Sequence, residues 1–398
     1  MINVTAIAVT MGVCALAGCR NPPVSDAPRI ANVFDYGAKG DGIHDDTPAI
    51  QAAIDAVAAR GGGKVFFPYT RNGYRLASPA KEFVNGRPCR SQLYIPQGIV
   101  NIQLEGEVPC LLLHCYMVVP PDVDPSNPNH NPTRFGTQRK VNVRLVSDWK
   151  PPVETNAAER PWSMLSVIPD WKSPAYPLNS CCVSIANLEF RAYLDKERMY
   201  AVQTAANLTE ASRVIVRDSQ FALNDHIGDT ALGKELLESP CPTAGLVMGR
   251  CLCDDQVIDN VAVQGFKYGI IMAEHTHANY VYLHNNEQAL VFVRACYHLS
   301  DIQFVVAEHN RIILSVPQES VFGHPYDPEQ PIRVKVRGVS IEDGIGNLPR
   351  ANQLKYGVSD PDNRLYGSIE YYIAQFTLFK PTFPVLGAHH FRIHEFDE

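Results

Sequence analysis

The stretch Val33–Ala58, VFDYGAKGDGIHDDTPAIQAAIDAVA, is followed directly by GGGKVFFP at Gly61–Pro68. It predicts a short strand, a tight turn rich in Gly and Asp, an amphipathic helix and a second strand. Thr47 stands where a helix N-cap belongs, and Pro48 occupies the first helical position, where its missing N–H costs nothing. Apolar residues recur at helical spacing on one face: Ile50, Ala53, Ile54 and Val57. Such a helix needs an apolar surface to cover, and the open end of a β-solenoid provides one.

This segment resembles the opening motif of the pectate-lyase-superfamily single-stranded right-handed β-helix proteins, which include polygalacturonase-like hydrolases and tailspike-like depolymerases. In that family the pattern DYGAKGDGxxDDTxAIQxAID opens the β-helix, and its helix caps the N-terminal end. The resemblance implies an all-β fold, a right-handed parallel β-helix with an N-terminal capping α-helix, and activity on polysaccharides. We expect the acidic residues of the motif, Asp41, Asp45 and Asp46, to cap turns and the helix start rather than to catalyse.

An internal repeat between Val183 and Leu314 supports a solenoid. Asp259–Met272 aligns with Asn279–Phe292 at an offset of 20, and Val305–Leu314 fits at an offset of 22. Alternating apolar residues with such periods are typical of a parallel β-helix, because each coil buries its face only against its neighbours. We therefore predict one β-helix domain over residues 31–398. Long loops are expected near 120–138, 151–180 and 222–243.

The N-terminal residues predict export. Residues 1–18 are interpreted as a signal peptide, because Leu16–Cys19, LAGC, resembles a bacterial lipobox in which Cys19 becomes lipidated. Residues 19–30 are a Pro-rich tether. We expect a bacterial lipoprotein on the periplasmic or cell surface, attached to the membrane only through its lipid.

Composition and cysteine spacing limit the partners. The 398 residues are 45% apolar and carry a net charge of -7, which argues against binding to nucleic acid. The cysteines lack the spacing of zinc sites, so the sequence predicts no metal and no cofactor. A polysaccharide or oligosaccharide is the expected ligand, and a monomer and a homotrimer are both compatible with the sequence.

The repeat also predicts which residues stack on neighbouring coils, about 4.8 Å apart. The offsets predict three stacks before the apolar strand: Phe266, Asn286 and Glu308; Lys267, Glu287 and His309; Tyr268, Gln288 and Asn310. In polygalacturonase-like enzymes the catalytic acids precede the equivalent strand on consecutive coils. The resemblance therefore implies a catalytic pair of Glu287 and Glu308, with carboxyls about 5–8 Å apart and Lys267 and His309 beside them.

Other residues are predicted to bind substrate, and some have structural alternatives. Tyr268, Asn286 and Arg294 belong to the same coils, and Asp225 and Asp229 lie in the insertion Ala222–Pro242, which departs from the coil period. Alternatively, the Lys267–Glu287 pair is only a surface salt bridge, and Asn286 is one rung of an internal hydrogen-bonding ladder.

Three functions are compatible with these patterns. The favoured one is hydrolysis of a polysaccharide by two carboxylates in a groove along the β-helix. The second is a lyase, in which Lys267, His309 or Tyr268 abstracts a proton next to a uronate that Arg294 or Arg311 neutralises. The third is a solenoid that binds carbohydrate through aromatic residues without turnover. The family's NTD, GHG and RIK signatures are absent from the sequence, so pectin-specific chemistry is not expected.

Overall fold

The computed structural model describes most of the predicted solenoid. The described residues are 29–110, 142–149, 162–168, 181–192, 204–223, 243–249, 256–322, 324, 326–342, 354–373 and 383–396, without 85, 97, 99, 273–274 and 294–295. The predicted signal peptide with Cys19 lies outside these ranges, as do Asp225, Asp229 and Arg294. The ranges contain no helix that is both long and apolar enough to cross a membrane.

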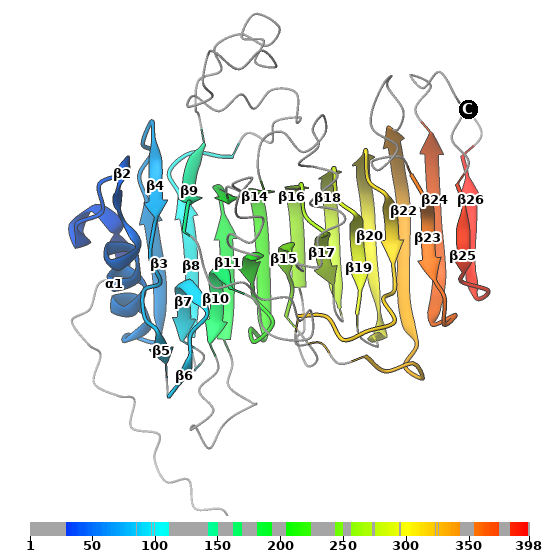
Figure 1. Cartoon of the computed structure of the whole chain (residues 1–398), viewed down its shortest axis with the longest axis horizontal. Coiled ribbons are helices and arrows are strands. Elements are labelled where there is room, and N and C mark those ends of the chain that lie inside the picture. Colours follow the sequence, from blue (N-terminus) through cyan, green and yellow to red (C-terminus); the bar gives the residue numbers. More distant parts are fainter. Residues whose placement is uncertain are drawn as a thin grey trace, which may run out of the picture.

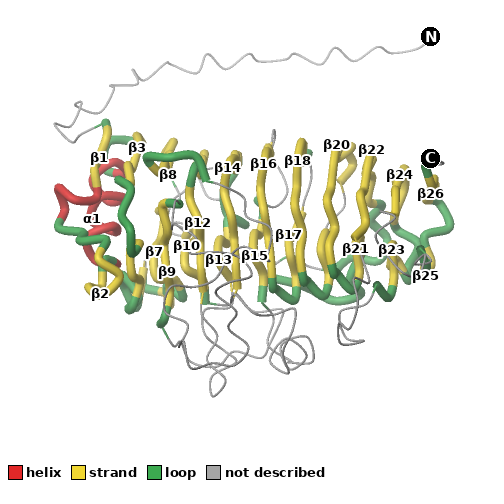
Figure 2. The backbone as a smooth tube through the Cα atoms, turned by 90° about the horizontal axis from the view of Figure 1, so that it is seen from above, coloured by secondary structure: helices red, strands yellow, loops and turns green. Residues whose placement is uncertain are grey.

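Two long parallel sheets run along the molecule, and their strands stack coil upon coil (Figures 1 and 2). The main path of the larger, 15-stranded sheet is β1 (Ile30–Asn32), β3 (Gly62–Phe67), β8 (Val100–Gly106), β11 (Cys181–Ala186), β14 (Arg213–Leu223), β16 (Gln256–Gln264), β18 (Thr276–His284), β20 (Cys296–Glu308), β22 (Ile332–Glu342), β24 (Leu365–Ile373) and β26 (Phe391–Glu395). Its other strands are β2 (Asp41–Asp45), β4 (Gly73–Leu76), β9 (Val143–Ser147) and β12 (Leu188–Ala192).

The second sheet has nine strands, and a short hairpin lies beside the first coils. The nine strands are β7 (Ser91–Pro96), β10 (Ser163–Ile168), β13 (Thr204–Asn207), β15 (Ala244–Val247), β17 (Tyr268–Met272), β19 (Gln288–Phe292), β21 (Ile312–Ser315), β23 (Tyr356–Asp360) and β25 (Val385–Gly387). The hairpin joins β5 (Phe83–Val84) to β6 (Arg87–Pro88). The predicted right-handed parallel β-helix is confirmed.

Helix α1 (Thr47–Ala58) caps the N-terminal end of this stack, as predicted (Figure 1). It follows the 3-10 turn η1 (Val33–Tyr36), and its apolar face, which includes Ile50 and Ile54, is completely buried in the main core. The N-cap is Asp46 rather than Thr47, because the helix begins one residue earlier than the side-chain preference suggests.

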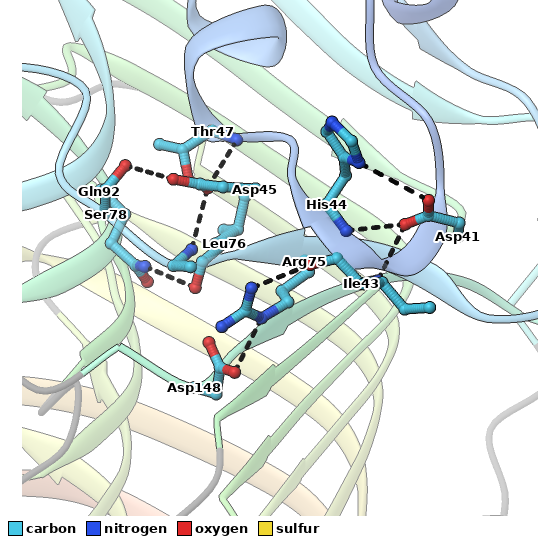
Figure 3. Close-up of polar contacts among 11 residues, drawn as sticks. Asp41, Ile43, His44, Asp45, Thr47, Arg75, Leu76, Ser78, Gln92 and Asp148 are labelled. Carbon is cyan, nitrogen blue, oxygen red and sulfur yellow. Dashed lines mark hydrogen bonds and ion pairs between the residues drawn. The ribbon is translucent and has the colours of Figure 1, made fainter.

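The acidic residues of the opening turn hold the backbone in place (Figure 3). Asp45 accepts hydrogen bonds from the hydroxyls of Thr47 (2.6 Å) and Ser78 (2.5 Å), whereas Asp41 accepts from the backbone N–H of His44 (2.8 Å). Burial alone would raise the pKa of Asp45, but the hydrogen bonds from Ser78 and Thr47 hold that pKa below its ordinary value. The expected structural role of these acids therefore agrees with their contacts.

The coil repeat is confirmed at one offset and corrected at the next. Strands β16 and β18 pair at the predicted offset of 20, with Ala262 opposite Tyr282. Strands β18 and β20 pair at an offset of 24, with His284 opposite Glu308, so the predicted 22 is wrong. The four added residues precede Ser300, because the backbone N–H of Thr276 bonds the Ser300 hydroxyl and His277 lies opposite Asp301. Glu308 therefore does not stack on Asn286, and His309 does not stack on Glu287.

Asn286 and Asn310 form a buried ladder at the turn between the two sheets. The Asn286 side chain donates to Asn310 Oδ1 (3.0 Å) and accepts from the backbone N–H of Phe266 (3.0 Å). The Asn310 side chain donates to the carbonyl of Leu283 (2.8 Å). Asn286 is thus the structural rung that the sequence left open as an alternative to substrate binding.

Replacing Asn286 with Leu should lower the free energy of unfolding by about 1–3 kcal/mol, because the Phe266 N–H would be left buried without a partner. Denaturant unfolding at equilibrium measures this loss. Asn279→Ala is the matched control, since Asn279 is exposed and its side chain donates to Asp259 on the surface; the variant should change stability by less than about 0.5 kcal/mol. Equal effects of the two variants would contradict a ladder that carries stability.

Candidate functional site

The outer face of the larger sheet carries two rows of buried residues, most of which are polar. Side chains alternate along each strand, and Phe221, Leu283 and Ala307 point into the main core, so their neighbours face outward. The first outward row is Glu189, Gln220, Ala262, Tyr282 and Val306. The second is Arg191, Ala222, Gln264, His284 and Glu308. Each of these side chains is at most 8% exposed, although outward-facing polar residues of a sheet are usually solvated.

Four residues of these coils meet in what we call the outer cluster: Tyr282, His284, Glu308 and His309. Tyr282 and His284 project from the same face of β18 because they are two residues apart. Glu308 ends β20 opposite His284, and His309 follows it in the turn. All four are between 2% and 4% exposed.

The contacts within the outer cluster join a phenol, a carboxylate and two imidazoles. The Tyr282 hydroxyl donates to Glu308 Oε2, while His309 Nε2 lies 3.8 Å from Glu308 Oε1. The His284 ring packs edge-to-face against His309 at 5.4 Å between centroids, and it lies parallel to the Tyr282 ring at 6.3 Å. The arrangement places several groups that hold or release protons within one shielded space.

His309 adopts a backbone conformation that few side chains take. Its φ is +55°, in the left-handed region, and the equivalent turns of the two preceding coils carry Gly265 and Asn285 there. Gly and Asn tolerate this region best, so a histidine here costs conformational energy that the turn must offset. The turn therefore fixes the imidazole next to Glu308.

His284, Glu308 and His309 also form a possible set of metal ligands. Their ligand atoms all lie within 4.8 Å of one another. Two imidazoles and one carboxylate are donors that divalent transition-metal ions accept. Among the described residues this cluster thus has the chemistry for either proton transfer or metal binding.

A charged row runs along the turn beside the outer cluster, and we call it the edge row: Lys267, Glu287, Arg311 and Lys355. Backbone hydrogen bonds place Glu287 between Lys267 and Arg311 on neighbouring coils. Burial raises the pKa of Glu287, and the three cations only partly counteract that effect. The predicted neighbours Lys267 and Glu287 do stack, but Arg311 rather than His309 completes their row.

The turns that carry the edge row are short. Three residues connect β16 to β17, β18 to β19 and β20 to β21: 265–267, 285–287 and 309–311. The corresponding connections of the flanking coils are much longer, as in 193–203, 224–243 and 343–355. The outer cluster and the edge row therefore belong to three central coils whose corners carry no insertion.

Tyr268, predicted to bind substrate, lies buried on the other sheet. Its ring packs edge-to-face on Phe322 at 5.8 Å between centroids, and its hydroxyl lies 3.5 Å from Glu319. Burial raises the pKa of Tyr268 further above its ordinary value, which disfavours the phenolate.

A second polar group lies on the same outer face, three coils before Tyr282. Arg191 Nε bonds Glu189 Oε1 (2.6 Å), and Asn142 donates to Glu189 Oε2 (2.8 Å). Burial would raise the pKa of Glu189, but Arg191 and Arg144 outweigh it and lower that pKa. Glu189 is consequently an ion-paired carboxylate. Because neighbouring coils are about 4.8 Å apart, three coils place Glu189 about 14 Å from Tyr282.

Sequence reasoning identified Glu308 and His309 but missed Tyr282 and His284. The available signal was the period of two along Tyr280–His284, which places the polar members of this apolar strand on one outward face. An outward position does not by itself predict burial, so the sequence pattern of β18 is the same as that of a strand with one solvent-exposed face.

Comparison with known proteins confirms the predicted superfamily for the opening segment. Residues 30–81 match the family model described as rhamnogalacturonase A/epimerase, pectate lyase-like. Mannuronan C5-epimerase AlgE5 and alginate lyase 7, both from Azotobacter vinelandii, are each 47% identical over 64 residues, or 16% of this chain. Those residues span only 6% and 7% of the two relatives. Plasmin and fibronectin-binding protein A of Streptococcus pneumoniae is 68% identical over 38 residues, which are 9% of this chain and 5% of that protein.

Solved structures resemble the chain over most of its length but only distantly. DFA-IIIase from Arthrobacter chlorophenolicus has 11% identity and a TM-score of 0.43, with 92% of this chain and 81% of that one covered. An exopolygalacturonase from Thermotoga maritima has 12% identity and a TM-score of 0.36, with coverage of 94% and 93%. The family-model match, residues 30–81, covers the end of the solenoid that carries α1 and does not reach the outer cluster.

Proposed function

We propose that the chain is a carbohydrate-active enzyme whose chemistry takes place at the outer cluster. The family description and the epimerase and lyase among the relatives support a role in carbohydrate processing. Plasmin and fibronectin-binding protein A also matches a short stretch of this chain, so a short match alone does not argue for catalysis. The observation that carries the proposal is the shielded contact of Tyr282 with Glu308 beside two histidines.

The arrangement favours proton abstraction next to a sugar carboxylate. Glu308 accepts the hydroxyl proton of Tyr282, which leaves the phenolic oxygen as a base toward a substrate C–H. His309 lies 3.8 Å from the other carboxylate oxygen, and His284, which packs against it, is assigned the proton transfer to the leaving glycosidic oxygen. The C–H electrons form a C=C bond while the C–O bond breaks, so the reaction is β-elimination.

The edge row suggests the kind of sugar. Its three cations exceed the single charge of Glu287, although the whole chain is acidic. Arg311 or Lys267 would partly neutralise the charge of a nearby uronate carboxylate, and the neighbouring C–H would then be easier to deprotonate. We therefore propose a uronate-containing polysaccharide or oligosaccharide as substrate.

Hydrolysis by the predicted carboxylate pair is less favoured. The sequence places Glu287 and Glu308 one coil and one residue apart, whereas Glu308 lies opposite His284, three residues before Glu287 on the neighbouring coil.

Digestion of a panel of acidic and neutral glycans tests the proposal. Elimination should yield products that absorb in the ultraviolet because of their new double bond. Hydrolysis should yield products heavier by one water and without that absorbance. Measurable binding without turnover on any glycan would contradict an enzyme and favour a binding solenoid.

A further inference from the structure

We propose that His284, Glu308 and His309 bind one divalent transition-metal ion, with Zn²⁺ as the best fit. The three residues come from two adjacent strands and the turn that follows them, so coil register brings their side chains together. The inference concerns metal binding by the outer cluster; only its inhibitory consequence rests on the proposed function.

The separation of Glu308 from His309 is suited to a shared ion. Their atoms Oε1 and Nε2 are 3.8 Å apart, which is too long for a hydrogen bond. Two ligands that each lie about 2.1 Å from one ion can be separated by up to about 4.2 Å. The atoms of all three residues lie within 4.8 Å of one another, so small side-chain rotations would complete the set.

Tyr282 orients the Glu308 carboxylate for metal binding. Its hydroxyl holds Glu308 Oε2 and leaves Oε1 on the side of His309. Ligating carboxylates and histidines in metal sites are commonly oriented by such outer hydrogen bonds. The carboxylate is therefore restrained in an orientation that presents one oxygen to an ion.

The donor set selects among metals. Two imidazoles favour Zn²⁺ and similar ions, whereas Ca²⁺ and Mg²⁺ prefer sites made of oxygen ligands. The three side chains are between 2% and 4% exposed, so an ion bound there would lose most of its water and rely on these ligands. Ca²⁺ should therefore not compete with Zn²⁺.

If the proposed proton transfer is correct, the ion should inhibit it. A metal occupies the lone pairs of Glu308, His284 and His309 that would otherwise accept protons. Zn²⁺ should then lower turnover with the same concentration dependence as its binding, and a chelator should restore activity.

Calorimetric titration of chelator-treated protein with Zn²⁺ tests the site without requiring turnover. We expect one ion per chain, no heat with Ca²⁺, and visible absorption bands when Co²⁺ is used. Glu308→Gln and His309→Ala should each weaken binding by at least about 100-fold, and Tyr282→Phe by about 10- to 100-fold. His277→Ala is the matched control because His277 lies exposed on the same strand, and its variant should bind normally.

The outcomes separate the two proposals. Absence of Zn²⁺ binding, or equal loss in His277→Ala, would overturn the metal site even if a glycan is cleaved. Binding that depends on Glu308 and His309 would support it even if no glycan is turned over. A rise in turnover with Zn²⁺ would overturn the inhibitory role, and circular dichroism of each variant shows whether a loss comes from misfolding.

Discussion

Glu308→Gln should lower turnover by at least about 10²-fold, and by as much as about 10⁴-fold, because it removes the group that accepts the Tyr282 proton. The amide keeps the volume of the carboxylate and its ability to accept a hydrogen bond from Tyr282. The variant should therefore fold as the parent does. Steady-state kinetics on the glycan found by the panel, together with thermal unfolding, measures both expectations.

Two further variants make the result specific. Glu319→Gln is the matched control, since Glu319 is exposed near Tyr268 on the other sheet, and its turnover should be unchanged. Glu287→Gln should have a smaller effect than Glu308→Gln, because Glu287 lies in the edge row rather than in the outer cluster. Equal large losses at Glu287 and Glu308 would favour the carboxylate pair expected from the sequence, and normal turnover of Glu308→Gln would contradict the proposed chemistry.

Ile54→Asp should lower the free energy of unfolding by about 3–5 kcal/mol. Ile54 is completely buried where α1 covers the first coil, so the new carboxylate would have to remain uncharged or unpaired in an apolar core. Loss of the cap would also expose the end of the sheets to other molecules. Denaturant unfolding and light scattering measure the two effects.

A substitution on the opposite face of the same helix is the control. Ala52 is exposed, and Ala52→Asp should cost only the difference in helix propensity, under about 1 kcal/mol. If Ile54→Asp proves as stable and soluble as Ala52→Asp, α1 does not protect the solenoid end.

The sequence was sufficient for the fold because its signals are local. The opening motif specifies α1 within a few turns of chain, and strict alternation marks strands such as β16 and β18. The predicted register failed at the start of β20, where the pairing shifts between Cys296 and Ser300 and no apolar pattern marks the longer coil. The error of two residues preserved the face on which Glu308 lies, since side chains alternate with a period of two. It changed only the neighbours of Glu308.

The candidate site was less predictable because it depends on contacts between coils. Tyr282 and His284 belong to the candidate site only because they contact Glu308 and His309, which are more than twenty residues away in sequence. Asn286 was ambiguous for the same reason: only its partner Asn310 identifies it as a ladder rung. Arg294, Asp225 and Asp229 lie outside the described residues, and their roles in substrate binding remain predictions.

The contrast between the short corners of three central coils and the long connections beside them has an evolutionary consequence. Coils are held mainly by their immediate neighbours, so a corner can lengthen or shorten without disturbing the hydrogen bonds of distant strands. The extra residues before Ser300 show this within the chain, since β20 pairs in regular register with β18 and β22 beyond them. Insertions and deletions can therefore change the connections around a binding face while the strands of the solenoid stay in register. Such a protein is well suited to acquiring new substrates in this way.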